Sequence, residues 1–163
     1  MEILKKNCPA IINVAILIIL SNLDRFDLLS NIFPKIIIPQ AVYQELNAKV
    51  KTTLPPFIEV KEVSSSKLLE ELKLLLDLGE SEAIALTVEL KSKLIIDERK
   101  GRKIAMNMGI TITGLLGIVY LNIKNSFISK VEAKEFLESA ISDGYRINSL
   151  LIEDMFKRVD KLG

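Results

Sequence analysis

The sequence contains no histidine and only one cysteine, Cys8. Without histidine there is no imidazole general base, no Cys–His dyad and no Ser–His–Asp triad. The same two shortages exclude zinc sites built from cysteine and histidine. Polar chemistry in this chain must therefore rest largely on carboxylates.

An excess of charge of either sign is also missing, with 22 Lys+Arg against 21 Asp+Glu and a formal net charge of +1. The whole chain therefore has no strong attraction to nucleic acid or membrane, and any nucleic-acid site has to be a local patch. With 163 residues, 49% hydrophobic and 26% charged, the chain is expected to be globular, with residues 1–163 forming one domain. A single cysteine excludes an internal disulfide and fits a reducing compartment.

Long apolar runs are absent as well. The longest, within residues 11–20, is interrupted by Asn13 and is too short to cross a bilayer. Lys5 and Lys6 ahead of this run resemble the start of a secretion signal, but no small-residue cleavage site follows. The β-branched start of the run favours a buried strand instead, so we expect a cytoplasmic protein that does not bind membranes.

Short β-branched runs alternate with amphipathic segments along the chain. Strands are predicted at residues 11–14, 36–38, 57–63, 94–96 and 110–112. Helices are predicted after the first strand and at residues 24–33, 39–50, 67–78, 79–92, 99–108 and 113–124, with two more after Ser129. Ser64–Ser66 and Gly79 are expected to bound one helix, and Gly109 to end another. The alternation predicts an α/β fold with a parallel sheet covered on both faces.

Carboxylates, or an amide in their place, occur where predicted strands meet helices. Asn13 lies late in the first strand, Asp97 directly follows the run LII, and Glu45 and Glu82 lie on helices able to face the same edge. In parallel sheets ligands bind at the carboxyl ends of the strands, and carboxylates there suit Mg²⁺ or Mn²⁺. Each of these residues could instead have a structural role that involves no ligand. Asp97 could cap a helix, Glu45 could lie on a solvated face, and Asn13 could bridge loops.

Two further acids and one basic run accompany these positions. Glu80 could serve the site or only favour a helix N-terminus, and Glu98 adjoins Asp97. The basic run consists of Arg99, Lys100, Arg102 and Lys103. It is either a solvated helix face or a contact for a polyphosphate backbone. No aromatic residue interleaves it, which argues against base stacking, and the chain has neither GxxxxGK[ST] nor GxGxxG.

Several segments together resemble PIN-domain nucleases, which include the VapC-type toxins, and more narrowly a compact prokaryotic branch of that family. They are IINVAILIILSNLDRFDLL, IIIPQAVYQEL, LGESEAIALTVEL, LIIDERKGRKIAMNMGITITGLLGI and YRIN near the end. The resemblance implies a three-layer α/β/α fold and an acidic pocket that binds Mg²⁺ or Mn²⁺ for RNA hydrolysis. It assigns the four family acids to Asn13, Glu45, Glu82 and Asp97, with Glu98 as a secondary acid.

The chain departs from that pattern at its first acid. Asn13 stands where active PIN nucleases have Asp, Ala15 where Ser or Thr is frequent, and Ile16 where Pro is frequent. An amide weakens a cation cage, because hard cations prefer charged oxygen ligands. The first hypothesis is therefore a metal-dependent ribonuclease that acts as the toxin-like member of a toxin–antitoxin pair, with low or no activity. The second is a catalytically degenerate interaction module.

The interaction module would pair with itself or with a small antitoxin-like protein. The resemblance and the apolar early helices predict a homodimer formed through Ile18, Ile19 and the segment LLSNIF. A third hypothesis is a phosphoacceptor receiver-like domain, which shares the strand–helix alternation. It requires an Asp at the end of a central strand, and the third predicted strand, FIEVKEV, offers none.

Overall fold

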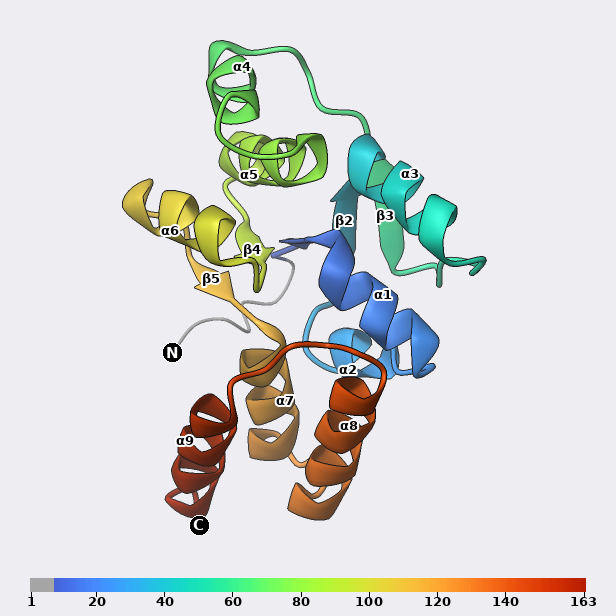
Figure 1. The fold of residues 1–163 in the computed structure, drawn as a ribbon, viewed down its shortest axis with the longest axis vertical. Helices are drawn as coiled ribbons and strands as arrows, with labels where there is room; N and C mark the ends of the chain where they lie inside the picture. The colour runs from blue at the N-terminus through green and yellow to red at the C-terminus, as the bar shows by residue number, and fades with distance from the viewer. Residues whose placement is uncertain (1–7) are drawn as a thin grey trace.

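A computed structural model of the chain describes residues 8–163. Within them, five strands form one parallel sheet in the order β3-β2-β1-β4-β5 (Figure 1). The strands are β1 (Ala10–Ile12), β2 (Ile36–Pro39), β3 (Ile58–Lys61), β4 (Lys93–Ile95) and β5 (Ile112–Thr113). The helices are α1 (Val14–Asn22), α2 (Asp27–Ser30), α3 (Gln40–Lys49), α4 (Lys67–Lys73), α5 (Leu78–Leu90), α6 (Arg99–Asn107), α7 (Leu115–Lys124), α8 (Lys130–Ser142) and α9 (Ser149–Asp160).

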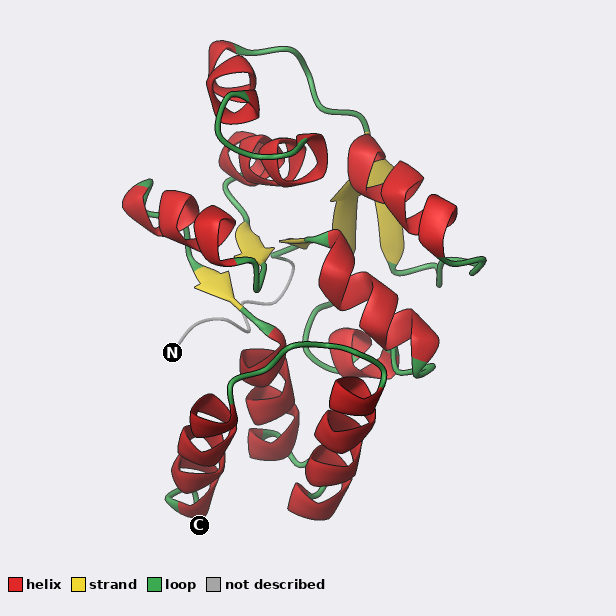
Figure 2. Cartoon of the chain, viewed as in Figure 1, coloured by secondary structure: helices red, strands yellow, loops and turns green. Residues whose placement is uncertain are grey.

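Alternate residues of the central strands face opposite sides of the sheet, as the two-residue period of a strand requires. Ala10 and Ile12 of β1 belong to one apolar core, and Ile11 belongs to another. The first core takes its helical side chains from α1, α2, α3, α7, α8 and α9. The second takes them from α4, α5 and α6. Helices thus cover both faces of the strands, and the α/β/α prediction is confirmed (Figure 2).

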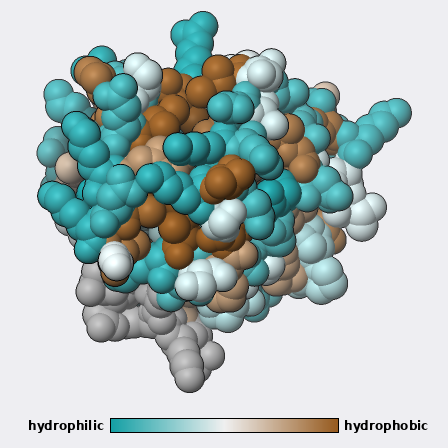
Figure 3. Space-filling model, turned by 90° about the horizontal axis from the view of Figure 1, so that it is seen from below, coloured by the Kyte–Doolittle hydropathy of each residue, from teal (hydrophilic) through white to brown (hydrophobic). Residues whose placement is uncertain are grey.

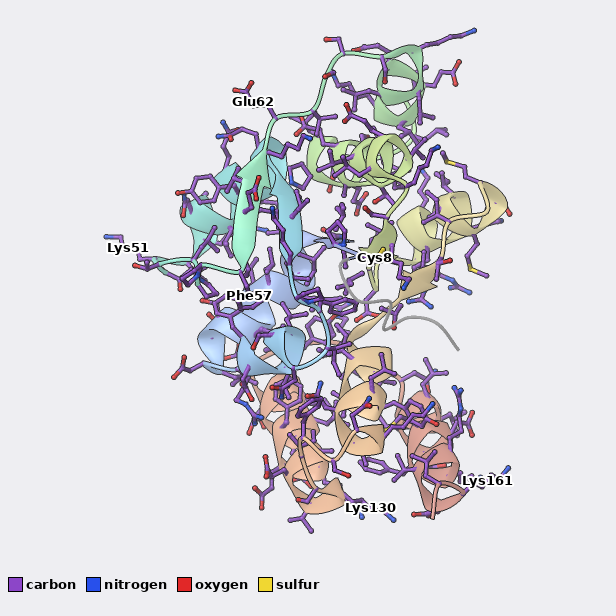
Figure 4. All side chains as sticks on the ribbon, turned by 180° about the vertical axis from the view of Figure 1, so that it is seen from behind. Cys8, Lys51, Phe57, Glu62, Lys130 and Lys161 are labelled. Carbon is purple, nitrogen blue, oxygen red and sulfur yellow. The ribbon has the colours of Figure 1, made fainter. Side chains whose placement is uncertain are left out.

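The alternation of apolar and charged residues in FIEVKEV predicts that the third strand lies at an edge of the sheet, and the structure confirms this. β3 pairs only with β2 in the described sheet, and its exposed positions carry charge at Glu59 and Lys61. Phe57 and Glu62 lie at the two ends of this strand in Figure 4. Lys35 forms an ion pair of 2.5 Å with Glu59 across the edge. Charged side chains of this kind discourage pairing with a further strand.

The predicted boundaries hold at some helices and fail at one. Ser66 caps α4 by accepting a hydrogen bond of 3.0 Å from the backbone N–H of Leu69, and Gly109, with φ of +78°, follows α6. Gly79, however, does not end the helix predicted at residues 67–78. α4 ends at Lys73, and Gly79 lies in the first turn of α5. The side chain of Asp77 caps that helix by accepting a bond of 2.8 Å from Glu80 N–H.

Most of the apolar residues expected to form a dimer surface lie inside the chain's own core, and Ile18 is partly buried against it. Ile19, Leu28, Leu29, Ile32 and Phe33 are all less than 9% exposed and belong to the first core. That argument for a homodimer surface is therefore wrong, because α7 and α8 complete the core around these side chains.

No helix in the described part of the chain combines the length and apolar character that a membrane span requires. Lys5 and Lys6 lie outside the described residues, whereas Ile11 and Ile12 belong to β1, as the buried-strand interpretation predicts. A cytoplasmic location stays a prediction.

Candidate functional site

The carboxyl ends of β1 and β4 lie side by side. The two strands are parallel with Ile12 opposite Ile95, and the backbone N–H of Asn13 donates a bond of 2.9 Å to the carbonyl of Ile95. Asn13 and Asp97 therefore follow neighbouring strands at the same edge of the sheet. Figure 1 shows these strand ends between α1 and α6.

Asn13 is buried, at 4% exposure, and is the N-cap of α1. Its side-chain oxygen accepts a hydrogen bond of 2.5 Å from the backbone N–H of Val14. One of the free N–H groups at the start of α1 is satisfied in this way. The amide that stands in place of the first family acid thus has a structural role.

Asp97 caps a helix, but not the one that follows it. Its Oδ2 accepts hydrogen bonds from the Leu115 backbone N–H at 3.1 Å and from the Tyr145 hydroxyl, and Oδ1 lies 3.6 Å from Nη1 of Arg102. Leu115 is the first residue of α7. The adjacent helix, α6, is capped by Glu98, which accepts from the N–H groups of Lys100 and Gly101.

Gly114 makes this contact possible. A Cβ at Gly114 would lie 1.9 Å from Oδ1 of Asp97 and 2.9 Å from Nη1 of Arg102. Any side chain would therefore displace the carboxylate from the start of α7. The glycine lets Asp97 and Arg102 approach the backbone of the β5–α7 turn.

Glu82 and Glu45 connect α3 and α5. Oε1 of Glu82 accepts a hydrogen bond of 3.1 Å from Ala41 N–H in the first turn of α3, whose N-cap, Pro39, offers no side-chain acceptor. Glu45 approaches the start of α5, where its Oε1 would lie 3.3 Å from a Cβ at Gly79. Its Oε2 also pairs with Lys49 at 3.3 Å. Because α3 follows the carboxyl end of β2, Glu82 reaches the same edge of the sheet as Asn13 and Asp97.

Glu80 and Glu98 join α5 to the β4–α6 turn. The pKa of Glu80 is raised from 4.5 to about 7, first by burial and then by the charges of Asp77 and Glu98, with a hydrogen bond to Glu98 adding to the shift. Two carboxyl groups in contact in a partly buried place repel each other once both are ionised. This pair is the strongest electrostatic conflict at the acidic edge.

The four basic residues of α6 divide into two kinds. Arg102 is half-buried and bonds to the carbonyl of Ile96 at 2.8 Å in addition to its contact with Asp97. Arg99, Lys100 and Lys103 are exposed. Arg102 thus holds the end of β4 in place, and the other three present charge to solvent.

The residues present fit a divalent cation in ligand type but are not assembled around one. Asp97, Glu82 and Glu45 supply carboxylates and Asn13 a neutral oxygen, which are ligands that Mg²⁺ and Mn²⁺ accept. Within residues 8–163, however, no three acidic or cysteine side chains are grouped closely enough to hold a metal ion. Each of the four candidates has a partner within the chain. A cation would have to compete with these contacts.

Tyr145 is the main residue of this edge that the sequence did not single out by its chemistry. It lies in the segment YRIN, between α8 and α9, and is held against Asp97. The resemblance to PIN domains included YRIN, and this was the one signal that pointed to it. Contact between residues so far apart in the chain has no local pattern.

In α/β proteins with parallel strands, ligands bind at the carboxyl edge of the sheet, and acidic side chains lie at that edge in this structure. A family model, DUF3368, described as a PIN domain, matches residues 9–161. The chain therefore belongs to the PIN-domain family, whose fold is of the nuclease type. No curated protein matches the sequence significantly.

Proposed function

We propose that the protein is a PIN-type ribonuclease dependent on Mg²⁺ or Mn²⁺, acting at the acidic edge that carries Asn13, Glu45, Glu82 and Asp97. The observation that supports this most is the meeting of separate acid-bearing elements at one edge of the sheet. Glu82 links α5 to the start of α3, and Glu80 meets Glu98 beside Asp97. Membership of the PIN family supplies the reaction class.

The cation would be held by Asp97, Glu82 and Glu45 with Asn13 as a neutral ligand. When bound there, the cation would supply an activated water for phosphodiester hydrolysis. To bind the cation, the acidic residues have to give up their present contacts with hydrogen-bond donors of the chain. Asp97 gives up its contact with Arg102, and Glu82 its bond to Ala41 N–H. We therefore expect weak cation binding, at millimolar rather than micromolar concentrations.

The test is cleavage of a labelled single-stranded RNA with Mn²⁺, with Mg²⁺ and with EDTA. The parent should cleave the RNA only when Mn²⁺ or Mg²⁺ is present. The cleavage rate should fall at least tenfold in each of the variants Asp97→Asn and Glu82→Gln. Glu89→Gln is the matched control, because Glu89 is an exposed acid on the same helix as Glu82. Absence of cleavage by the parent under all cation conditions would contradict the proposal.

A second candidate is an interaction module, toxin-like or not, that works by pairing. Two observations favour it: the candidate ligands already have internal partners, and three leucines at the α4–α5 turn are exposed. Leu74 is 85%, Leu75 53% and Leu78 48% exposed. Apolar side chains gathered in this way mark interaction surfaces. Under this proposal the surface pairs with a second copy of the chain, and a small antitoxin-like protein is the rival occupant.

Light scattering separates these cases. A homodimer at micromolar concentration should become monomeric in the double variant Leu74→Ser with Leu75→Ser. Val131→Ser, which changes an apolar residue of similar exposure on α8, should leave it dimeric. A monomeric parent would contradict the homodimer and leave a different partner as the occupant to be sought.

A further inference from the structure

A groove of about 890 Å³ extends from Asp97 along α7 and α9. It begins at Gly114 in the β5–α7 turn, passes Gly117 in α7, and continues past the segment that joins α8 to α9. Five cationic side chains line it, against the carboxylates of Asp97 and Asp154. They are Arg102, Arg146, Lys157, Arg158 and Lys161.

These cations come from separate parts of the chain. Arg102 belongs to α6, Arg146 to the segment before α9, and the other three to the end of α9 (Lys161 is labelled in Figure 4). Basic residues are common in the last turn of a helix, because they complement its dipole. That explanation covers Lys157 and Arg158 but not Arg102 or Arg146. Arg102 has a structural role beside Asp97, whereas Arg146 has no ion pair within residues 8–163 that would account for its place at the groove.

Most of this charge is not neutralised by the chain. Within residues 8–163 no ion pair involves Arg146, Lys157, Arg158 or Lys161, all of which are exposed. Arg158 lies over the ring of Tyr120, 5.0 Å from its centroid. The groove therefore presents a positive rim to solvent although the whole chain is close to neutral.

The floor of the groove is apolar. Ile112, Leu116, Ile147 and Leu151 line it together with Tyr120. Leu151 is 56% exposed. Viewed from the side on which α7, α8 and α9 lie, apolar side chains are exposed between hydrophilic ones (Figure 3). A positive rim above an apolar and aromatic floor fits a ligand with a polyanionic backbone and flat apolar faces.

We propose that this groove binds single-stranded RNA and leads it to Asp97. The phosphates contact the cationic rim, and the bases lie on the floor against Tyr120. A double helix fits less well, because its bases are stacked inside and cannot reach an apolar floor. The choice of RNA rests on the proposed function. The RNA strand would then follow α7 and α9. The basic run of α6 suggested a different path for the RNA, over the exposed face that carries Arg99, Lys100 and Lys103.

Two triple variants with equal loss of charge distinguish the two paths. One is Arg146→Gln, Arg158→Gln and Lys161→Gln in the groove. The other is Arg99→Gln, Lys100→Gln and Lys103→Gln on α6. Each lowers the formal net charge by three, from +1 to −2. Glutamine keeps part of the side-chain stem, and all six positions are exposed, so the fold should survive.

The measurement is fluorescence anisotropy with a short labelled oligouridylate in EDTA, at several salt concentrations. EDTA makes binding independent of cleavage, so that failure of the proposed activity and failure of this proposal are distinguishable. Each phosphate contact with a single strand contributes about −0.7 to the slope of log affinity against log salt. The groove variant should therefore lose about two from the magnitude of that slope and bind roughly tenfold or more weakly at low salt.

The α6 variant should lose less than half as much in both quantities. An equal or larger loss in the α6 variant would overturn the proposal, as would equally tight binding of duplex RNA. Tighter binding of single-stranded DNA of matching sequence would overturn the choice of RNA. Asp154→Asn tests the groove in the opposite direction. Removal of an exposed negative charge from the rim should tighten binding several-fold, and unchanged affinity would count against the groove.

Discussion

The hydroxyl group of Tyr145 donates a hydrogen bond to Oδ2 of Asp97, a residue 48 positions earlier in the chain. Burial and then the charge of Asp97 raise the pKa of the Tyr145 hydroxyl well above its usual value of 10.0. The hydroxyl therefore remains a donor at every ordinary pH. The contact fixes the segment between α8 and α9 against the end of β4 and orients Asp97 toward α7.

Tyr145→Phe should lower the free energy of unfolding by about 1–2 kcal/mol, because a hydrogen bond to a carboxylate is lost in a partly buried place. It should also increase the rise in Tm that Mn²⁺ produces, since Asp97 then has one competitor fewer. Urea unfolding and thermal melting with and without Mn²⁺ measure the two effects. Tyr43→Phe is the control, because the Tyr43 hydroxyl makes no hydrogen bond within residues 8–163. Equal effects of both substitutions would refute the role given to Tyr145.

Glu80 should make the protein less stable as the pH rises from about 4.5 to about 7. Its pKa is raised in the folded state, so the folded chain binds this proton more tightly than the unfolded chain, and the free energy of unfolding falls over that window. Solvent screening at this partly exposed carboxyl limits the loss to about 1 kcal/mol.

Glu80→Gln should remove that part of the pH dependence, with a gain in stability at pH 8 and little change at pH 4. Urea unfolding in EDTA across this range is the measurement, with Glu89→Gln as the control on the same helix. A parent and a Glu80→Gln variant with parallel pH profiles would show that the Glu80–Glu98 conflict is absent in solution.

Asn13→Asp should destabilise the protein by about 1–3 kcal/mol at pH 7 without metal, because it buries a charge at a site with 4% exposure. Aspartate can still cap α1, so the loss reports the charge rather than the cap. Millimolar Mn²⁺ should restore stability, because a cation that binds the folded state raises Tm. If melting shows no larger gain with Mn²⁺ than in the parent, Asn13 lies outside any cation site and the interaction module becomes the leading function.

Gly114→Ala should lower the free energy of unfolding by about 1–3 kcal/mol through overpacking against Asp97. Combining it with Asp97→Ala removes the clash, so the double variant should lose less than the sum of the single variants. A double-mutant cycle in urea measures this coupling. Strict additivity would mean that the β5–α7 turn shifts away from Asp97 at no cost.

Local patterns were enough to predict the sheet and most helix boundaries. The strands predicted at residues 11–14, 36–38 and 94–96 correspond, within two residues at each end, to the three central strands β1, β2 and β4. Ser66 caps its helix as expected. These features depend on neighbours within a few residues. Gly79 was wrongly predicted to end a helix, because a glycine at this position is explained by a tertiary contact and not by a helix end. It lies where Glu45 of α3 approaches the start of α5.

The candidate site shows the same division. That Asp97 follows a strand could be predicted, and capping was considered for it, but the helix it caps begins 18 residues later. A contact of Arg102 with RNA stays a prediction, and the pairing of Arg102 with Asp97 could not be predicted from its place in the basic run. The assignment of Asn13, Glu45, Glu82 and Asp97 to one cation site stays a prediction. Spacing along the chain cannot say which oxygens remain available once helix ends have been capped.

The dependence of Asp97 on Tyr145 has a consequence for biosynthesis. A growing chain possesses all five strands once Thr113 has been made, but the partner that fixes Asp97 is still to be synthesised. A nascent or truncated chain that ends before Tyr145 also lacks α9 and one wall of the groove beside it. Translation order thus leaves the contact with Asp97 and the wall of the groove unformed until Tyr145 and α9 have been made.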